Sequence, residues 1–174
     1  MSDIRTILVP IDFSLGSRAA LRHAAMIAER FGARIQLLHV WEPSPVVAPN
    51  QMAWVGGDAD TFWRELSGDL KKRIDALVAD EVPHLRHDIN VAVEAGYVAH
   101  SIVRHVERGS YDLVVMGTHG RTGLSHLLLG SVAERVVRMS PTPVLTVRVP
   151  KELEKAAAEE RKRTRELPHA APTH

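Results

Sequence analysis

Residues 113–132 read LVVMGTHGRTGLSHLLLGSV, and this stretch is the strongest indication of the fold. It opens with an uninterrupted apolar run, Leu113 to Met116, which is typical of a central parallel strand covered on both faces. A glycine-containing loop follows, and Gly130-Ser131 then precedes the apolar positions of a helix. The stretch therefore predicts a buried strand, a loop and a helix start in immediate succession.

The same alternation of short strands and longer helices runs through the first 149 residues. Apolar or β-branched runs predict strands at 4–9, 33–40, 89–94, 113–116 and 144–149, and Pro10 marks the end of the first one. Between them lie segments of helical periodicity, the first with Ser14 or Ser17 as its N-cap and Gly32 at its end. The order βαβαβαβαβ predicts an α/β fold, an open parallel sheet with helices on both faces.

A long amphipathic helix is predicted after a Pro- and Gly-rich loop at 41–58. One of its faces carries Phe62, Leu66, Leu70, Ile74 and Leu77, and the next position on that face is polar, Glu81. Three tryptophans lie around this loop and helix, Trp41, Trp54 and Trp63. We interpret them as a lid or a hydrophobic contact surface rather than a base-stacking platform, because no basic stripe accompanies them.

Composition limits the possible functions. The 174 residues include 22 Lys plus Arg against 21 Asp plus Glu, and no cysteine. Near-neutrality argues against a nucleic-acid binder, and the missing cysteines exclude disulfides, thiol catalysis and thiolate metal sites. Neither a signal peptide nor an apolar stretch of about 18 residues is present, so we expect a cytoplasmic protein without membrane partners. Residues 1–149 form the predicted domain, and 150–174 a charged extension, partly helical or disordered.

Ligands of open α/β sheets bind beyond the carboxyl ends of the strands, where the strand order reverses. The glycine loop lies at such an end. Gly117 and Gly120 allow close approach of the backbone to a ligand, and the helix beginning at Gly130-Ser131 favours an anion. The sequence contains no G-x-x-x-x-G-K-[ST], and no G-x-G-x-x-G follows the first strand. The loop therefore predicts a phosphate cradle of a different type.

The spacing Gly117-x2-Gly120-x9-Gly130-Ser131 resembles the ATP-binding form of the universal stress protein family, whose pattern is G-x2-G-x9-G-[ST]. Two further stretches carry the resemblance, ILVPIDFS at 7–14 and SPTPV at 140–144. It implies a five-stranded sheet of order 3-2-1-4-5, Rossmann-like and similar to adenine nucleotide α-hydrolases. It also implies a homodimer formed through the last strand, from Val144 to Val149.

The resemblance further implies roles for individual residues. Gly117, Gly120, Gly130 and Ser131 would hold the phosphates, and the Asp12 carboxylate would accept hydrogen bonds from the ribose hydroxyls. An apolar adenine slot would be formed by Ile11, Val40 and Met116, with a backbone contact from Val132. Pro10 and Arg121 complete the candidate set. The cofactor would be ATP, or ADP or AMP, together with Mg²⁺, and the protein itself would supply no dedicated metal site.

Several of these residues have simpler interpretations. Asp12 could cap a turn, the glycines could serve only a tight turn, and Ser131 is a suitable N-cap without any ligand. Arg121 could clamp a phosphate or stabilise the loop surface, whereas His119 is expected to face solvent. The histidine pairs His84/His87 and His100/His105 lack a third ligand at metal-binding spacing. G-L-S-H-L at 123–127 falls one glycine short of a nucleophile elbow.

The absence of an evident base, nucleophile or P-loop lysine favours a nucleotide-binding stress-response regulator that acts through an unidentified protein partner. A slow ATPase or adenylyl-transfer enzyme is the alternative, disfavoured because residues 10–20 contain no histidine. A phospho-accepting receiver domain is a third, weaker possibility, since the additional acidic pair and the late lysine are missing. For the first hypothesis, Gly117→Val and Gly130→Val are expected to abolish ATP binding while leaving the fold intact.

Overall fold

The computed structural model of this chain describes residues 3–42, 59–85, 89–118, 129–150, 152, 153 and 156, with only the backbone described at 59–67. Strands and helices alternate along the chain. In order they are β1 (Thr6–Ile11), α1 (Leu15–Phe31), β2 (Arg34–Trp41), α3 (Ala59–Glu81), the short 3₁₀ helix η1 (Pro83–Leu85), β3 (Ile89–Ala95), α4 (Val98–Arg108), β4 (Leu113–Gly117), α5 (Ser131–Met139) and β5 (Val144–Val147).

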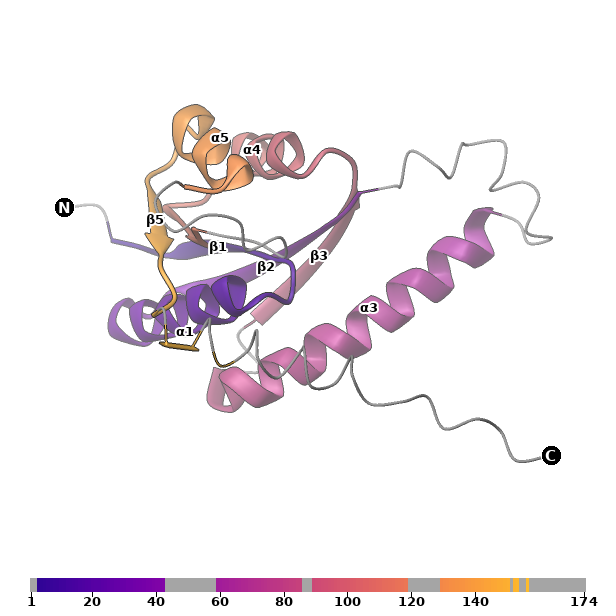
Figure 1. Cartoon of the computed structure of the whole chain (residues 1–174), viewed down its shortest axis with the longest axis horizontal. Helices are drawn as coiled ribbons and strands as arrows, with labels where there is room; N and C mark the ends of the chain where they lie inside the picture. The colour runs from indigo at the N-terminus through magenta and orange to yellow at the C-terminus, as the bar shows by residue number, and fades with distance from the viewer. Residues whose placement is uncertain are drawn as a thin grey trace.

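The five strands form one sheet in the order β3-β2-β1-β4-β5, and every neighbouring pair is parallel. This confirms the predicted architecture and strand order. Helices α1 and α3 cover one face of the sheet, and α4 and α5 cover the other (Figure 1). The strand order reverses between β1 and β4, because the chain builds the sheet outward first through β2 and β3 and then through β4 and β5.

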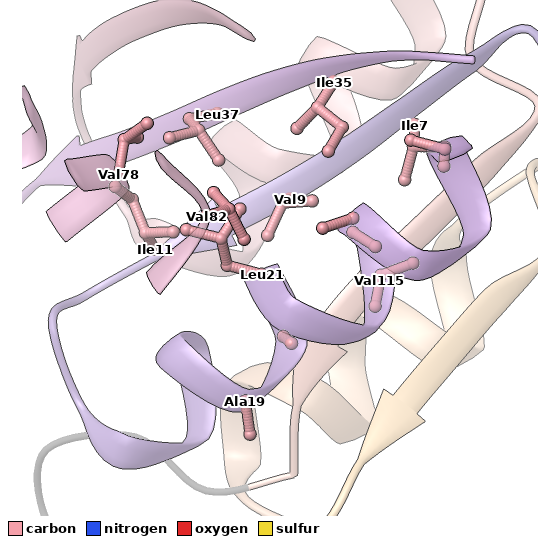
Figure 2. Close-up of a cluster of buried hydrophobic side chains, with 14 of the residues drawn as sticks. Ile7, Val9, Ile11, Ala19, Leu21, Ile35, Leu37, Val78, Val82 and Val115 are labelled. Atoms are coloured by element: carbon pink, nitrogen blue, oxygen red, sulfur yellow. The ribbon is translucent and has the colours of Figure 1, made fainter. Parts of the chain in front are cut away.

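The core lies in two layers because successive strand residues point to opposite faces. On the α1/α3 face, Ile7, Val9 and Ile11 of β1 pack with Leu21 of α1 and Val78 of α3 (Figure 2). Leu8 of β1 points to the opposite face of the sheet and belongs to the second cluster. That cluster contains residues from both helices of the α4/α5 face, including Ala99, Ile102, Val106, Ala133 and Val136.

The end of α3 explains the polar residue on its apolar face. Ile74 and Leu77 are fully buried, as predicted, and Glu81 follows them on the same side. Its carboxylate accepts a hydrogen bond from Arg18 Nη1 at 2.8 Å and forms a second ion pair with Arg22. Both arginines belong to α1, so Glu81 ties the end of α3 to α1 rather than interrupting the apolar contact.

The ends of α1 follow the prediction. Ser14 is the N-cap, and its hydroxyl accepts a hydrogen bond from the Ser17 backbone N–H at 3.2 Å. Gly32 ends the helix in the left-handed region, with φ of 66°. Two expectations were wrong: β1 does not stop before Pro10 but continues to Ile11, and the N-cap of α5 is Gly130, with Ser131 as the first helical residue.

Within the part of the chain that the structure describes, no helix is both long and apolar enough to cross a membrane.

Candidate functional site

The sheet opens between β1 and β4 at their carboxyl ends. Thr6 O accepts a hydrogen bond from Asp112 N, so the even-numbered backbone groups of β1 point toward β4. Pro10 has the same orientation but lacks an N–H group. Within the described strands, β1 accordingly pairs with β4 only at Ile7 and Leu8, whereas it pairs with β2 as far as Ile11. Pro10 thus ends the ladder at the point where ligands of such sheets bind.

Asp12 lies directly after β1, at this opening. Its Oδ1 accepts hydrogen bonds from the Ser14 backbone N–H at 3.0 Å and from the Ser14 hydroxyl at 2.6 Å. Among the residues that the structure describes, no donor contacts its second oxygen, Oδ2. Asp12 therefore does cap its own turn, but this role uses only Oδ1 and leaves Oδ2 available.

Gly117 is the last residue of β4 and lies against the first turn of α1. A Cβ built on Gly117 would stand 2.7 Å from the backbone carbon of Gly16 and 2.9 Å from its Cα. Real Cβ atoms do not approach backbone this closely, so glycine is required here by packing alone. The expectation that Gly117→Val leaves the fold intact is therefore wrong: the side chain would push α1 away from β4.

The two ends of the glycine loop meet at its base. Gly130 N donates a hydrogen bond to Thr118 O at 2.8 Å, and Thr118 N donates to Val147 O of β5 at 2.9 Å. This joins the end of β4 to the start of α5, as a cradle between Gly117 and Gly130 requires. The first turn of α5 receives no side-chain cap, unlike that of α1. N–H groups in the first turn of a helix favour a negatively charged ligand.

Three of the four apolar candidates share one side of the sheet. Val40 and Met116 are buried in the α4/α5 cluster, and Val132 packs against it. The Ile11 side chain is buried in the other cluster, beneath α1 and α3. A slot lined jointly by the side chains of Ile11, Val40 and Met116 is therefore inconsistent with the sheet geometry, because the Ile11 side chain lies on the opposite face of the sheet from Met116.

The remaining loop candidates, Gly120 and Arg121, lie outside the described residues, as do His119 and the 123–127 segment. So do Trp54 and nearly all of the 150–174 extension. For Trp63 the backbone alone is described. Their expected roles remain predictions.

Histidines serve in ion pairs and hydrogen bonds. His84 Nε2 lies 2.5 Å from Glu29 Oε1. His105 links Glu94, at 2.6 Å from Nδ1, to the Tyr111 hydroxyl, at 2.9 Å from Nε2. Burial, followed by the charge of Glu94, raises the pKa of the Tyr111 hydroxyl above its ordinary value. Over the described ranges, no group of three or more His, Asp or Glu residues could hold a metal ion.

Two residues beside the site were not singled out from the sequence, Phe13 and His39. Phe13 is the one residue other than glycine with a positive φ in the described part of the chain, at 66°. His39 is buried and its Nδ1 lies 2.8 Å from Ile11 O. The available signal was a histidine at an inward position of a buried strand, which alternation by itself identifies only as a core position.

Comparison with known proteins gives consistent results. Residues 3–148 match the model of the universal stress protein family. Universal stress protein MJ0531 of Methanocaldococcus jannaschii is 36% identical over 151 residues, covering 84% of this chain and 84% of that protein. Universal stress protein A homolog 1 of Coxiella burnetii is 32% identical over 146 residues, covering 81% of this chain and 94% of that protein.

Solved structures share the architecture. The structure of protein MJ0577 aligns with a TM-score of 0.68 at 26% identity, over 86% of this chain and 99% of its own. A crystal structure of a universal stress protein in complex with cAMP aligns with a TM-score of 0.57 at 26% identity, over 84% of this chain and 98% of its own. The sheet order, the opening at Pro10 and the match over residues 3–148 all indicate the same family. The chain belongs to the universal stress protein family.

Proposed function

We propose that this protein binds an adenine nucleotide, ATP or its products ADP and AMP, at the opening between β1 and β4. The nucleotide state would regulate a protein partner during a stress response. The observation that carries the proposal is that three groups lie at the carboxyl end of the sheet, where β1 and β4 separate. These are the Asp12 carboxylate with Oδ2 available, the uncapped first turn of α5, and the loop base closed by Gly130 and Thr118.

Each group suits one part of a nucleotide. Carboxylate oxygens accept hydrogen bonds from ribose hydroxyls, and helix N–H groups bind phosphate oxygens. Val40, Met116 and Val132 supply apolar surface on the α4/α5 side, where a base would avoid water. The cAMP complex of a relative supports nucleotide binding as the chemistry of this fold family. Pro10, Gly120, Arg121 and Ser131 stay in the proposed site, and Ile11 borders it without contributing its side chain.

Magnesium fits this site only as a partner of the phosphates. The described residues offer no cluster of three acidic or histidine ligands, and Asp12 uses one oxygen in its own turn. Mg²⁺ commonly takes few protein ligands and completes its octahedron with phosphate oxygens and water. We therefore expect Mg²⁺ to bind with the nucleotide and not to the protein alone.

Asp12→Asn is the sharpest test of the proposed site. Asn retains an oxygen to accept the two Ser14 hydrogen bonds, but it replaces Oδ2 by an NH₂ group that cannot accept. A charge-assisted hydrogen bond contributes about 1.5–3 kcal/mol, so ATP affinity should fall about ten- to hundredfold. Isothermal titration with ATP and Mg²⁺ measures this, and the thermal midpoint without ligand should remain unchanged.

Gly130→Val tests the phosphate end of the same site. Gly130 has φ of −59° and ψ of 148°, which valine also adopts, so the fold should persist while the side chain obstructs the first turn of α5. No heat of binding by the unaltered protein at millimolar ATP with Mg²⁺ would refute the proposed function. Phosphate release equal in the unaltered protein and in Asp12→Asn would dismiss the alternative of a slow ATPase at this site.

The proposal also includes a homodimer through the edge strand β5 and a cytoplasmic location. Exposed apolar side chains on β5 and the neighbouring α5, Leu145, Val137 and Met139, support the dimer. The location and the identity of the partner rest on the sequence-based expectation alone.

A further inference from the structure

The turn that presents Asp12 contains a conformation that phenylalanine rarely adopts. Phe13 has φ of 66°, a region that costs free energy for residues with a Cβ. Such a backbone persists only where the surroundings hold it. The contacts of Phe13 with the rest of the protein are therefore informative about what fixes this turn.

The Phe13 ring contacts side chains from two other elements. Its centroid lies 5.1 Å from that of the His39 ring, at an interplanar angle of 48°. The guanidinium carbon of Arg73, on α3, lies 4.2 Å from the Phe13 centroid, which is a cation–π geometry. β2 and α3 thus both contact the turn between β1 and α1.

Arg73 is held in place by the packing of its helix. Its neighbour Ile74 is fully buried, and Val78, one turn further along α3, lies in the same cluster as Ile11 of β1 (Figure 2). The Arg73 side chain itself is exposed. The position of the guanidinium over Phe13 therefore depends on the docking of α3 against the sheet.

His39 fixes the other side of Asp12. Its Nδ1 lies 2.8 Å from Ile11 O, and a carbonyl oxygen can only accept, so Nδ1 carries the hydrogen and donates it. Ile11 O belongs to the peptide group that joins Ile11 to Asp12, and that group is planar. The backbone before Asp12 is thus held by His39, and the backbone after it by Phe13.

We propose that His39, Phe13 and Arg73 are positioning residues that orient the Asp12 carboxylate, with Oδ1 bound to Ser14 and Oδ2 directed at the ribose of the nucleotide. This inference rests on the proposed function and adds residues that do not touch the ligand. It also couples the site to α3: undocking of α3 removes Arg73 from Phe13 and weakens recognition of the ribose.

The test measures ribose recognition separately from overall binding. Its readout is the ratio of the dissociation constants of 2′,3′-dideoxy-ATP and ATP, both with Mg²⁺, in the full-length protein. A ratio of about ten to one hundred is expected for the unaltered protein, because the dideoxy compound cannot donate to Asp12. A purely structural defect weakens both nucleotides equally and leaves this ratio unchanged.

His39→Leu removes the donor to Ile11 O and should lower the ratio toward one, mainly through weaker ATP binding. His39→Asn is the conservative variant, because an amide nitrogen attached to Cγ occupies the place of Nδ1. His39→Asn should restore most of the ratio that is found in the unaltered protein. Equal ratios in His39→Leu and the unaltered protein would overturn the proposal.

Arg73→Met keeps the helix and removes the cation, and as a surface substitution it is expected to fold. The ratio should fall about two- to fivefold, the fold-change that corresponds to one exposed cation–π contact. Lys72→Met is the matched control, since Lys72 pairs with Asp69 on the same helix, and its ratio should be unaltered. Equal ratios in Arg73→Met and Lys72→Met would overturn the role of α3.

Two further outcomes separate this inference from the proposed function. An unaltered protein that binds neither nucleotide refutes the proposed function and the inference with it. An unaltered protein that binds both nucleotides equally retains nucleotide binding but overturns the inference, because Asp12 would then make no contact with the ribose.

Discussion

Two serines near helix starts differ in what they contribute to the structure. Ser14 is buried, accepts a hydrogen bond from Ser17 N and donates one to Asp12 Oδ1. Ser131 lies one position inside α5, where Gly130 is the N-cap and no side chain caps the helix. The sequence favours serine at both places for the same reason, but only Ser14 stabilises its helix through its hydroxyl.

Ser14→Ala should therefore lower the free energy of unfolding by about 1–2 kcal/mol, because a first-turn N–H loses its partner. Ser131→Ala should change it by less than about 0.5 kcal/mol, since no cap is lost and alanine suits a helix. Urea denaturation monitored by circular dichroism measures both. A loss for Ser131→Ala as large as that for Ser14→Ala would show that Ser131 caps α5.

At the scale of elements, the contact between α1 and β4 depends on two glycines. Gly16 and Gly117 bring the first turn of α1 against the end of β4 with backbone touching backbone. This contact places the start of α1, directly after the turn containing Asp12, beside the end of β4. The packing of α1 against β4 thus also sets the position of the turn that contains Asp12.

Gly117→Ala should destabilise the protein by about 1–3 kcal/mol, because the added methyl group has backbone as its neighbour and forces α1 to shift. Gly68→Ala is the matched control on α3: nothing lies within 4 Å of the added Cβ, so the better helix former should stabilise by about 0.5–1 kcal/mol. Thermal unfolding of the two variants should give midpoint shifts of opposite sign. A stable Gly117→Ala would indicate that glycine is kept there for a ligand alone.

The junction of α1 and α3 depends on charge. Burial by itself would raise the pKa of the Glu81 carboxyl, but the hydrogen bonds and charges of Arg18 and Arg22 outweigh it and hold the pKa below its ordinary value of 4.5. A carboxyl whose pKa is lowered by folding stabilises the protein above the unfolded-state pKa. This stabilisation is lost as the pH falls through the folded-state value.

Glu81→Gln should accordingly reduce the free energy of unfolding by about 1–3 kcal/mol at pH 7, because two arginines lose their carboxylate. The difference from the unaltered protein should shrink as the pH falls below about 4.5, where Glu81 protonates first in the unfolded state, and should disappear below the lowered folded-state pKa. Asp75→Asn removes the exposed pair with Lys71 on the same helix and should have little effect. Urea denaturation between pH 7 and pH 3 measures this, and a difference independent of pH would contradict the assignment.

At the scale of the whole molecule, the two edges of the sheet are β3 and β5 (Figure 1). Leu145 on β5 and Val91 on β3 are equally exposed, at 38% each. An edge strand with exposed apolar side chains can pair with a second copy about a twofold axis. The proposed dimer uses β5, and its neighbour α5 carries two further exposed apolar residues, Val137 and Met139.

Leu145→Lys should therefore convert the proposed dimer into a monomer while the fold persists, because a charge would be buried between two copies of β5. Val91→Lys places the same charge at the same exposure on β3 and should leave the dimer intact. Light scattering at high micromolar concentration gives the mass of each variant. If only Val91→Lys dissociates the dimer, the interface lies on β3 and not on β5.

Much of this architecture could be predicted from local pattern. Apolar runs such as Leu113 to Met116 and the spacing of Ile74 and Leu77 depend on burial, which periodicity records directly. The two ends of α1, Ser14 and Gly32, were also predicted from local pattern. The strand order was predicted from the family resemblance. The candidate site was predicted at the carboxyl ends of β1 and β4, because ligand position in an open α/β sheet follows from strand order.

The sequence by itself thus determined most of the elements and the sheet, and it predicted a site at the carboxyl ends of β1 and β4. Only the tertiary structure showed that Ile11 and Met116 point to opposite faces, that Gly117 serves the contact with Gly16, and that Phe13 is held by His39 and Arg73. The physical reason is the separation along the sequence between the residues that are in contact. Periodicity and capping act over a few residues, whereas these contacts join residues up to about one hundred positions apart, which meet only when the helices pack onto the sheet.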